Sequence, residues 1–209
     1  MAKRLQMVES QIERRGVKDK SVLLAMRNVK RHLFVPESQQ GLAYDDHPLS
    51  IGHGQTISQP FIVAYMSEAI ELKKGEKVLE VGTGSGYQAA ILAEMGADVY
   101  SIEIVKPLAE SAKKRLKKLG YDQIHVKWGD GYQGWVEYAP FDAIIITAAP
   151  PEIPKKLIQQ LKVGGRMIVP VGDFSQQLVL IIKKEDGIKI TELIPVRFVP
   201  MVRKEDLQS

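Results

Sequence analysis

A glycine-rich segment near the middle of the chain has the composition of a nucleotide-binding loop. It reads Leu79-Glu80-Val81-Gly82-Thr83-Gly84-Ser85-Gly86-Tyr87, and it follows a predicted strand and opens a predicted helix. Glycines allow a tight turn at such a junction and let a ligand approach the backbone closely. The spacing is G-x-G-x-G, whereas a dinucleotide site would carry G-x-G-x-x-G and a phosphate-binding loop would carry Gly-Lys-Ser/Thr.

The charges around this loop favour a cationic ligand without phosphates. No Lys or Arg occurs between positions 77 and 104, and Glu80 at the start of the loop would attract a cation or an amino group. Glu103 ends the next predicted strand, where a carboxylate can accept hydrogen bonds from both hydroxyls of a ribose. Asp130, in a Gly-Asp-Gly triplet, can accept a hydrogen bond from an exocyclic amine such as that of adenine. The alternative is that Gly82–Gly86 is only a tight turn and Glu103 only a surface acid.

The elements that position these residues predict an α/β fold, Rossmann-like and doubly wound. From residue 77 onward strands alternate with helices, which is typical of a mostly parallel sheet covered on both faces. An antiparallel C-terminal hairpin, 178–183 and 188–193, closes the sheet. The remaining predicted strands are 78–81, 99–104, 124–128, 141–147 and 166–171, and the helices between them are 87–95, 107–119 and 154–161.

The front of the chain is predicted to be an added segment of helices and loop. Helical patterns cover residues 1–35, with Leu5, Val8 and Ile12 on one buried face and Asp19 as the N-cap of the second helix. Residues 36–58 show no helical period, and a loop of this length is more often functional than idle. A further helix begins at Pro60 and ends near residue 75.

Composition excludes several classes of protein. Apolar residues make up 44% of the 209 and charged residues 26%, which is a globular mixture. Cysteine is absent, so disulfide scaffolds, iron–sulfur clusters and Cys nucleophiles are excluded. The His and Asp residues between positions 45 and 53 match no standard metal spacing, and we expect no metal.

Charge and hydropathy limit the partners. The net charge is only +4, and aromatic residues, 7% of the chain, do not accompany the lysines, so we expect no nucleic-acid partner. The basic run 113–118 is interpreted as a solvated helix face. The longest apolar runs are far too short to span a bilayer, and the N-terminus shows no apolar signal core, so we expect no membrane partner and a cytoplasmic location.

Two motifs resemble those of a class of enzymes. The sequence VLEVGTGSGY resembles the glycine motif of the Rossmann-like S-adenosylmethionine-dependent methyltransferases, and SIEI resembles their acidic strand end. The resemblance implies S-adenosyl-L-methionine as cofactor and S-adenosyl-L-homocysteine as product. The cofactor carries a sulfonium and no phosphate, in agreement with the missing basic residues. It implies cofactor contacts by Glu80, Gly82, Thr83, Gly84, Ser85, Gly86, Glu103, Asp130 and Gly131.

A narrower resemblance covers nearly the whole chain in order. The segments RHLFVP (31–36), YDDHPL (44–49), IGHGQTISQP (51–60), LKVGGR (161–166) and RFVPM (197–201) resemble the protein-L-isoaspartate O-methyltransferases. The resemblance implies methyl transfer to the free carboxylate of L-isoaspartyl residues in damaged proteins and peptides. The methyl ester then cyclises to a succinimide, which can open to normal aspartate. We accordingly expect a single methyltransferase domain over 1–209, with 1–75 forming the N-terminal helices and the substrate-side loop and 76–209 the cofactor-binding core.

The resemblance also assigns residues on the substrate side. The active-site hydroxyl of the family falls on Ser58, and substrate contacts fall on Gln55, Thr56, Ile57 and Ser58. The chain departs from the family at one place. Some members read Ser-Ala-Pro-His-Met where this chain reads Ser58-Gln59-Pro60-Phe61-Ile62. From position alone, Ser58 could instead cap the helix that begins at Pro60.

Two other functions stay open at this point. Whichever function holds, we expect a monomer. A small-molecule carboxyl or hydroxyl methyltransferase would share the glycine loop but would need no extended peptide groove. A cofactor-dependent binding or regulatory module without turnover would need the loop but not Ser58.

Overall fold

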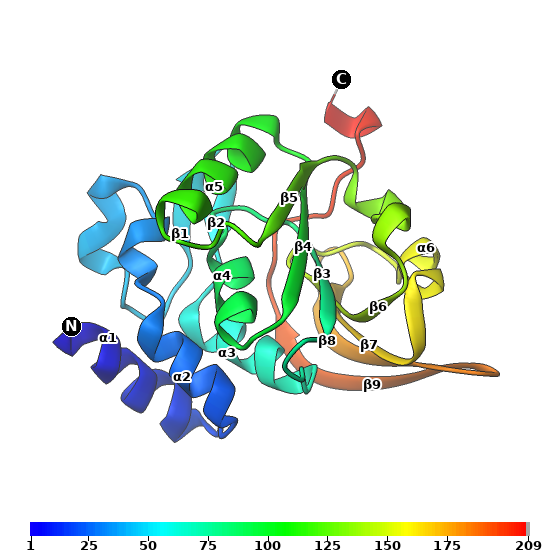
Figure 1. Ribbon diagram of the computed structural model, residues 1–209, viewed down its shortest axis with the longest axis horizontal. Coiled ribbons are helices and arrows are strands. Elements are labelled where there is room, and N and C mark those ends of the chain that lie inside the picture. Colours follow the sequence, from blue (N-terminus) through cyan, green and yellow to red (C-terminus); the bar gives the residue numbers. More distant parts are fainter. Residues whose placement is uncertain (208–209) are drawn as a thin grey trace.

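A seven-stranded sheet lies at the centre of the fold, and its middle strands are buried and rich in aliphatic residues (Figure 1). The computed structural model describes residues 1–207. The strand order is β5-β4-β3-β6-β7-β8-β9, in which β3 to β7 pair in parallel and β8 and β9 pair antiparallel. The strands are β3 (Lys77–Val81), β4 (Asp98–Glu103), β5 (His125–Trp128), β6 (Phe141–Ile146), β7 (Leu161–Val171), β8 (Gln176–Lys184) and β9 (Gly187–Val196). The predicted doubly wound sheet with its antiparallel C-terminal hairpin is confirmed.

Helices cover both faces of the sheet. Successive side chains of a strand point to opposite faces, and in the central strands both sets are largely apolar, so each face needs a cover. Val78 packs in one core, beneath α2, α3 and α4, and its neighbour Leu79 packs in the other, beneath α6. Both side chains are fully buried. The helices are α1 (Ala2–Met7), α2 (Lys20–Asn28), α3 (Pro60–Ala69), α4 (Tyr87–Glu94), α5 (Lys106–Lys118) and α6 (Lys155–Gln159).

The N-terminal helices pack on the core as predicted, with differences in detail. The Asp19 carboxylate caps α2 by accepting hydrogen bonds from the amides of Ser21 (2.8 Å) and Val22 (3.0 Å). The predicted buried face holds for Val8 and Ile12 but is wrong for Leu5, which is 39% exposed. The first helix changes to a π-helix over Val8–Ile12, so Met7 takes the buried place instead. Helix α3 ends at Ala69, short of the predicted position.

The segment 36–58, expected to be irregular, holds regular structure. Two 3₁₀ helices, Arg31–Phe34 and Glu37–Leu42, lead into a small antiparallel pair formed by β1 (Leu49–Gly52) and β2 (Gln55–Ile57). Pairing satisfies backbone groups that a structureless loop would leave open. The hairpin sets the position of the residues that follow it, Ser58 included.

The helix after β6 is shorter than predicted and β7 longer. The predicted helix 154–161 is only Lys155–Gln159, and β7 begins at Leu161 and runs through Gly164 and Gly165. Gly164 has a φ of +80°, and the pairing of β6 with β7 shifts there, as in a β-bulge. The glycines therefore bend a strand rather than stop a helix.

The rest of the described chain contains short elements only. Residues 1–207 include no helix that is long and apolar enough to cross a bilayer. Further 3₁₀ turns are Glu13–Arg15, Gly131–Gln133, Val136–Tyr138 and Glu205–Leu207.

Candidate functional site

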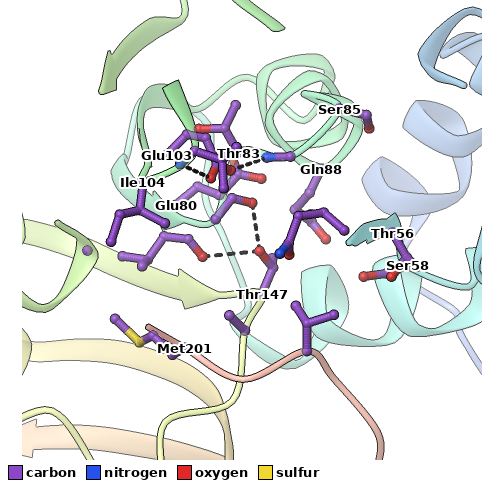
Figure 2. Close-up of a pocket in the computed structure, with 18 of the residues that line it drawn as sticks. Thr56, Ser58, Glu80, Thr83, Ser85, Gln88, Glu103, Ile104, Thr147 and Met201 are labelled. Carbon is purple, nitrogen blue, oxygen red and sulfur yellow. Dashed lines mark hydrogen bonds between the residues drawn. The ribbon is translucent and has the colours of Figure 1, made fainter. Parts of the chain in front are cut away.

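A pocket opens at the carboxyl ends of β3, β4 and β6, which is the edge where open α/β sheets bind ligands. In Figure 2, Glu103 and Ile104 lie on one side of this pocket and Thr56 and Ser58 lie on the other. The predicted residues that line it are Gln55, Thr56, Ile57, Ser58, Glu80, Gly82, Thr83, Gly84, Ser85, Glu103 and Gly131. Segments far apart in the sequence thus meet as the predictions require.

The start of the glycine loop leaves no room for a side chain. Gly82 has a φ of +98°, and a Cβ built there would lie 2.4 Å from Oγ1 of Thr147. That hydroxyl donates a hydrogen bond to the carbonyl of Gly82 at 2.7 Å. Gly131 also lines the pocket, and a Cβ there would lie 2.4 Å from a methyl group of Val81. Neighbouring side chains therefore leave no space for a side chain at either glycine.

Glu103 anchors the same loop. Its Oε2 accepts a hydrogen bond from the amide of Gly84 at 2.7 Å, and its Oε1 accepts one from the amide of Val105 at 2.9 Å. Burial raises the pKa of the carboxyl, and these amides oppose the rise. Each carboxylate oxygen has two acceptor sites, so a further acceptor site stays available to a ligand hydroxyl.

Glu80 is a fully buried acid beneath the loop. Its Oε2 accepts a hydrogen bond from the hydroxyl of Ser101, which lies 2.5 Å from Oγ1 of Thr83. Burial raises the pKa of Glu80 to about 8, and the Ser101 hydrogen bond opposes this. The amide of Ala89 also lowers the pKa, but Oε1 finds no partner with hydrogen-bond geometry among the described residues. A buried acceptor without a partner fits a donor that comes from outside the chain.

Two predicted cofactor residues lie beside the pocket rather than in its lining. Gly86 is the N-cap of α4 with a φ of +87°, and its backbone packs against Leu116. Asp130 caps a 3₁₀ turn, since its Oδ1 accepts a hydrogen bond from the amide of Tyr132 at 2.8 Å. Both support the local backbone in this structure.

A groove continues the pocket on the side of Ser58. The groove has a volume of about 750 Å³, and five residues line both cavities: Thr56, Ser58, Thr147, Val199 and Pro200. Ser58 therefore lies where a cofactor in the pocket would meet an acceptor in the groove. Helix α3 has Gln59 at its N-cap and no side-chain cap, so the capping alternative for Ser58 is wrong.

The two residues that depart from some relatives have separate places. Phe61 is buried, and the guanidinium of Arg15 lies 3.5 Å from the centre of its ring. Arg15 also pairs with Asp46 at 2.7 Å. Through its two contacts Arg15 joins the N-terminal segment and the loop at Asp46 to Phe61 of α3. Ile62 lines the groove.

Sequence reasoning missed four lining or supporting residues or segments. Gln88 lines the pocket and donates a hydrogen bond to Ser67 at 2.8 Å. Arg115, interpreted as part of a solvated face, donates to the carbonyl of Ser85 in the glycine loop at 2.9 Å. The segment from Val199 to Val202 closes the pocket from the C-terminal side. Of these, only Thr147 could have been found from the sequence, because it ends a predicted buried strand and therefore lies at the carboxyl edge of the sheet.

Comparison with known proteins decides the family. The family described as "Protein-L-isoaspartate(D-aspartate) O-methyltransferase (PCMT)" matches residues 2–206. This chain belongs to that family. The resemblance inferred from the motifs is confirmed, and so is the assignment as an enzyme of this kind.

Relatives match over most of their length. The protein-L-isoaspartate O-methyltransferase of Gloeobacter violaceus is 57% identical over 201 residues, which cover 95% of this chain and 98% of the relative. That of Picosynechococcus is 55% identical, covering 96% of this chain and 90% of the relative.

Solved structures of the family share the fold. One protein-L-isoaspartate O-methyltransferase has a TM-score of 0.89 at 31% identity and matches 96% of this chain, which spans 66% of that longer one. A Plasmodium falciparum member, described in complex with S-adenosyl-L-homocysteine, has a TM-score of 0.82 at 30% identity, covering 95% of this chain and 98% of that one.

Proposed function

We propose that this chain transfers a methyl group from S-adenosyl-L-methionine to the free carboxylate of L-isoaspartyl residues in damaged proteins and peptides. The resulting ester begins repair through a succinimide. The observation that carries the proposal is the position of Ser58 at the junction of the pocket and the groove. Such a junction lets a cofactor and a polypeptide enter from different sides and meet at one side chain.

The pocket residues fit this cofactor. Glu80 offers a buried oxygen without a partner to an amino group, and Glu103 offers carboxylate acceptors to a ribose. The backbone of Gly82, Thr83 and Gly84 follows the wall between these two acids. When bound, S-adenosylmethionine supplies a methyl group bonded to a sulfonium, and the neutral thioether that remains after transfer is a good leaving group. The chain therefore has to bind and orient rather than activate.

The acceptor needs little acid–base chemistry. A carboxyl group has a pKa of about 4, so the isoaspartyl carboxylate is an anion at neutral pH and needs no general base. The Ser58 hydroxyl can donate a hydrogen bond to this carboxylate and fix its rotation. No described residue hydrogen-bonds that hydroxyl, so it is free to do so. Orientation and exclusion of water of this kind account for up to about 7–11 kcal/mol in favourable cases.

The groove leaves room for a polypeptide acceptor. It is lined chiefly by the segments 56–62 and 195–200, and its volume is about 750 Å³. One chain supplies both segments and the whole pocket, so the proposed reaction needs no second copy, and we propose that the enzyme acts as a monomer. We propose that it acts in the cytoplasm.

Methyl transfer to matched peptides tests the proposal. An isoaspartyl peptide and the aspartyl peptide of the same sequence would be incubated with the enzyme and cofactor labelled in its methyl group. We expect label in the isoaspartyl peptide only, because the two carboxylates differ in their distance from the backbone. Equal labelling of both would contradict the repair function. Labelling of free small carboxylates but of neither peptide would support the small-molecule alternative.

A further inference from the structure

The turn between β7 and β8 carries a fully exposed aromatic side chain. Phe174 has a relative exposure of 108%, the highest of any large apolar residue in the part of the chain that the structure describes. Exposed apolar residues are common singly and need no explanation by themselves. The place of this one in the fold is what makes it informative.

The turn lies at the same edge of the sheet as the pocket and groove. Strand β7 runs parallel to β6 and ends at Val171, so the turn that follows is at the carboxyl edge. The amide of Gly172 donates to the carbonyl of Pro150 at 3.0 Å, a few residues after Thr147 of the groove. By contrast Val136, 74% exposed, lies just before β6 and hence at the opposite edge.

Gln176 fixes the turn to the wall of the groove. Its side-chain amide donates to the carbonyl of Phe198 at 3.0 Å and accepts from the amide of Phe198 at 2.6 Å. Gln176 is itself buried, and Phe198 lines the groove. Gly172 makes the turn tight, since a Cβ there would lie 2.2 Å from the carbonyl oxygen of Ser175. The turn is therefore short and braced against the wall of the groove, and the side chain of Phe174 projects from it into solvent.

We propose that Phe174 extends the groove and binds an apolar side chain of the substrate polypeptide near its isoaspartyl residue. This inference rests on the proposed function. The adjoining wall is itself largely apolar, with Pro195, Phe198 and Pro200 in its lining, so an apolar residue of the substrate continues the same surface. Contact with Phe174 removes apolar area of both partners from water, which is favourable in proportion to that area. Phe174 is thus a specificity-determining residue that contributes to peptide binding and not to the transfer step.

Kinetics with paired peptides test this role. Isoaspartyl peptides would differ only in Leu or Ser, placed in turn at each position on either side of the isoaspartyl residue. For the native chain we expect a lower KM for the Leu peptide at one or two positions, by about three- to tenfold for partial burial of such side chains. Phe174→Ser should remove that difference while kcat and the KM for the cofactor stay unchanged, and Phe174→Leu should keep most of it.

Val136→Ser is the matched control, because it removes another exposed apolar side chain, at the far edge. It should leave the preference for Leu intact. The inference is overturned if the native chain shows no preference, if Phe174→Ser retains it, or if Phe174→Ser raises the KM of Leu and Ser peptides alike. A native chain that methylates no isoaspartyl peptide would instead overturn the proposed function, and the inference with it.

Discussion

The two walls of the site are built in different ways. The cofactor wall is buried and densely hydrogen-bonded, with Glu103 holding the amide of Gly84 and Thr147 holding the carbonyl of Gly82. On the acceptor wall Thr56 is exposed, Ser58 is half-buried, and its hydroxyl is free of partners among the described residues. A rigid wall suits one invariant cofactor, and an open wall suits polypeptides of many sequences. Changes to the first wall should therefore alter cofactor affinity and stability, and changes to the second should alter turnover and peptide binding.

The largest effect is expected for Gly82→Ala. The new Cβ would meet the Thr147 hydroxyl at 2.4 Å. The alanine would also have to keep a positive φ, which residues with a side chain rarely adopt. Strain and overpacking together cost about 2–5 kcal/mol, and the loop would have to move away from the cofactor. Calorimetry should find cofactor binding weakened by more than about 100-fold. Gly41→Ala is the control, since a Cβ there meets nothing within 4 Å. Native affinity in Gly82→Ala would show that the cofactor wall is not rigid.

Glu80 makes the cofactor wall sensitive to pH. Its pKa is raised from an ordinary 4.5 to about 8 by burial. An acid with a raised folded-state pKa stabilises the fold fully below its unfolded pKa, and that contribution is lost as pH rises toward the folded value. The free energy of unfolding without cofactor should thus fall between about pH 5 and pH 8, by a few kcal/mol at about 1.4 kcal/mol per pKa unit.

Glu80→Gln checks this assignment, because it cannot ionise but can still accept the hydrogen bond from Ser101. Chemical denaturation at several pH values should show a flatter profile for the variant than for the native chain. The native chain should also bind the cationic cofactor more tightly as pH approaches 8, and the variant should not. Parallel profiles would mean that another group titrates.

The acceptor wall should respond differently, and Ser58→Ala is the test. Loss of one hydrogen bond to a charged group costs about 1.5–3 kcal/mol in the transition state, or roughly 10–150-fold in rate. Cofactor affinity and melting temperature should hardly change, because Ser58 neither caps α3 nor bonds to the loop. Turnover and melting point would be measured together, with exposed Ser38→Ala as control. A lowered melting point with native turnover would remove Ser58 from the mechanism.

Glu103→Ala sharpens the comparison from the other side. We expect cofactor binding to weaken by about 1–3 kcal/mol, because both the proposed ribose contact and the hydrogen bond to Gly84 are lost. Peptide KM at saturating cofactor should stay near its native value. Exposed Glu110→Ala, on α5, controls for loss of a negative charge nearby. Unchanged cofactor affinity on calorimetry would place the ribose elsewhere.

The cofactor wall could be predicted from residues, whereas the acceptor wall depended on resemblance. The glycine loop is local, and the carboxyl ends of parallel strands must share an edge, so Glu80, Gly82 and Glu103 are brought together by topology alone. The hairpin β1–β2 escaped because its strands, of four and three residues, are too short to show a period. Whether the chain forms one domain, and which residues touch ligands, stay predictions.

Side chains that reach across the fold were beyond sequence reasoning. Gln176 meets Phe198 only because β8 and β9 pair in one register. Asp130 shows a role that its Gly-Asp-Gly triplet did not predict, since one of its oxygens caps a 3₁₀ turn, and its contact with a ligand stays a prediction. A run of basic residues on a helix predicts an exposed face. On α5 that pattern does not reveal that Arg115 alone turns inward to the glycine loop.

That arginine gives the smallest expected effect. Arg115 is half-buried, and its Nη1 donates to the carbonyl of Ser85 from α5, while exposed lysines flank it on the same helix. Arg115→Met keeps much of the packing and removes the hydrogen bond, which is worth about 0.5–1.5 kcal/mol net. The KM for the cofactor should rise about two- to tenfold, with kcat and peptide KM unchanged. Lys114→Met, on the exposed face, should change none of these. A fall in kcat in Arg115→Met would show that α5 supports more than the cofactor wall, and that the two walls are mechanically joined.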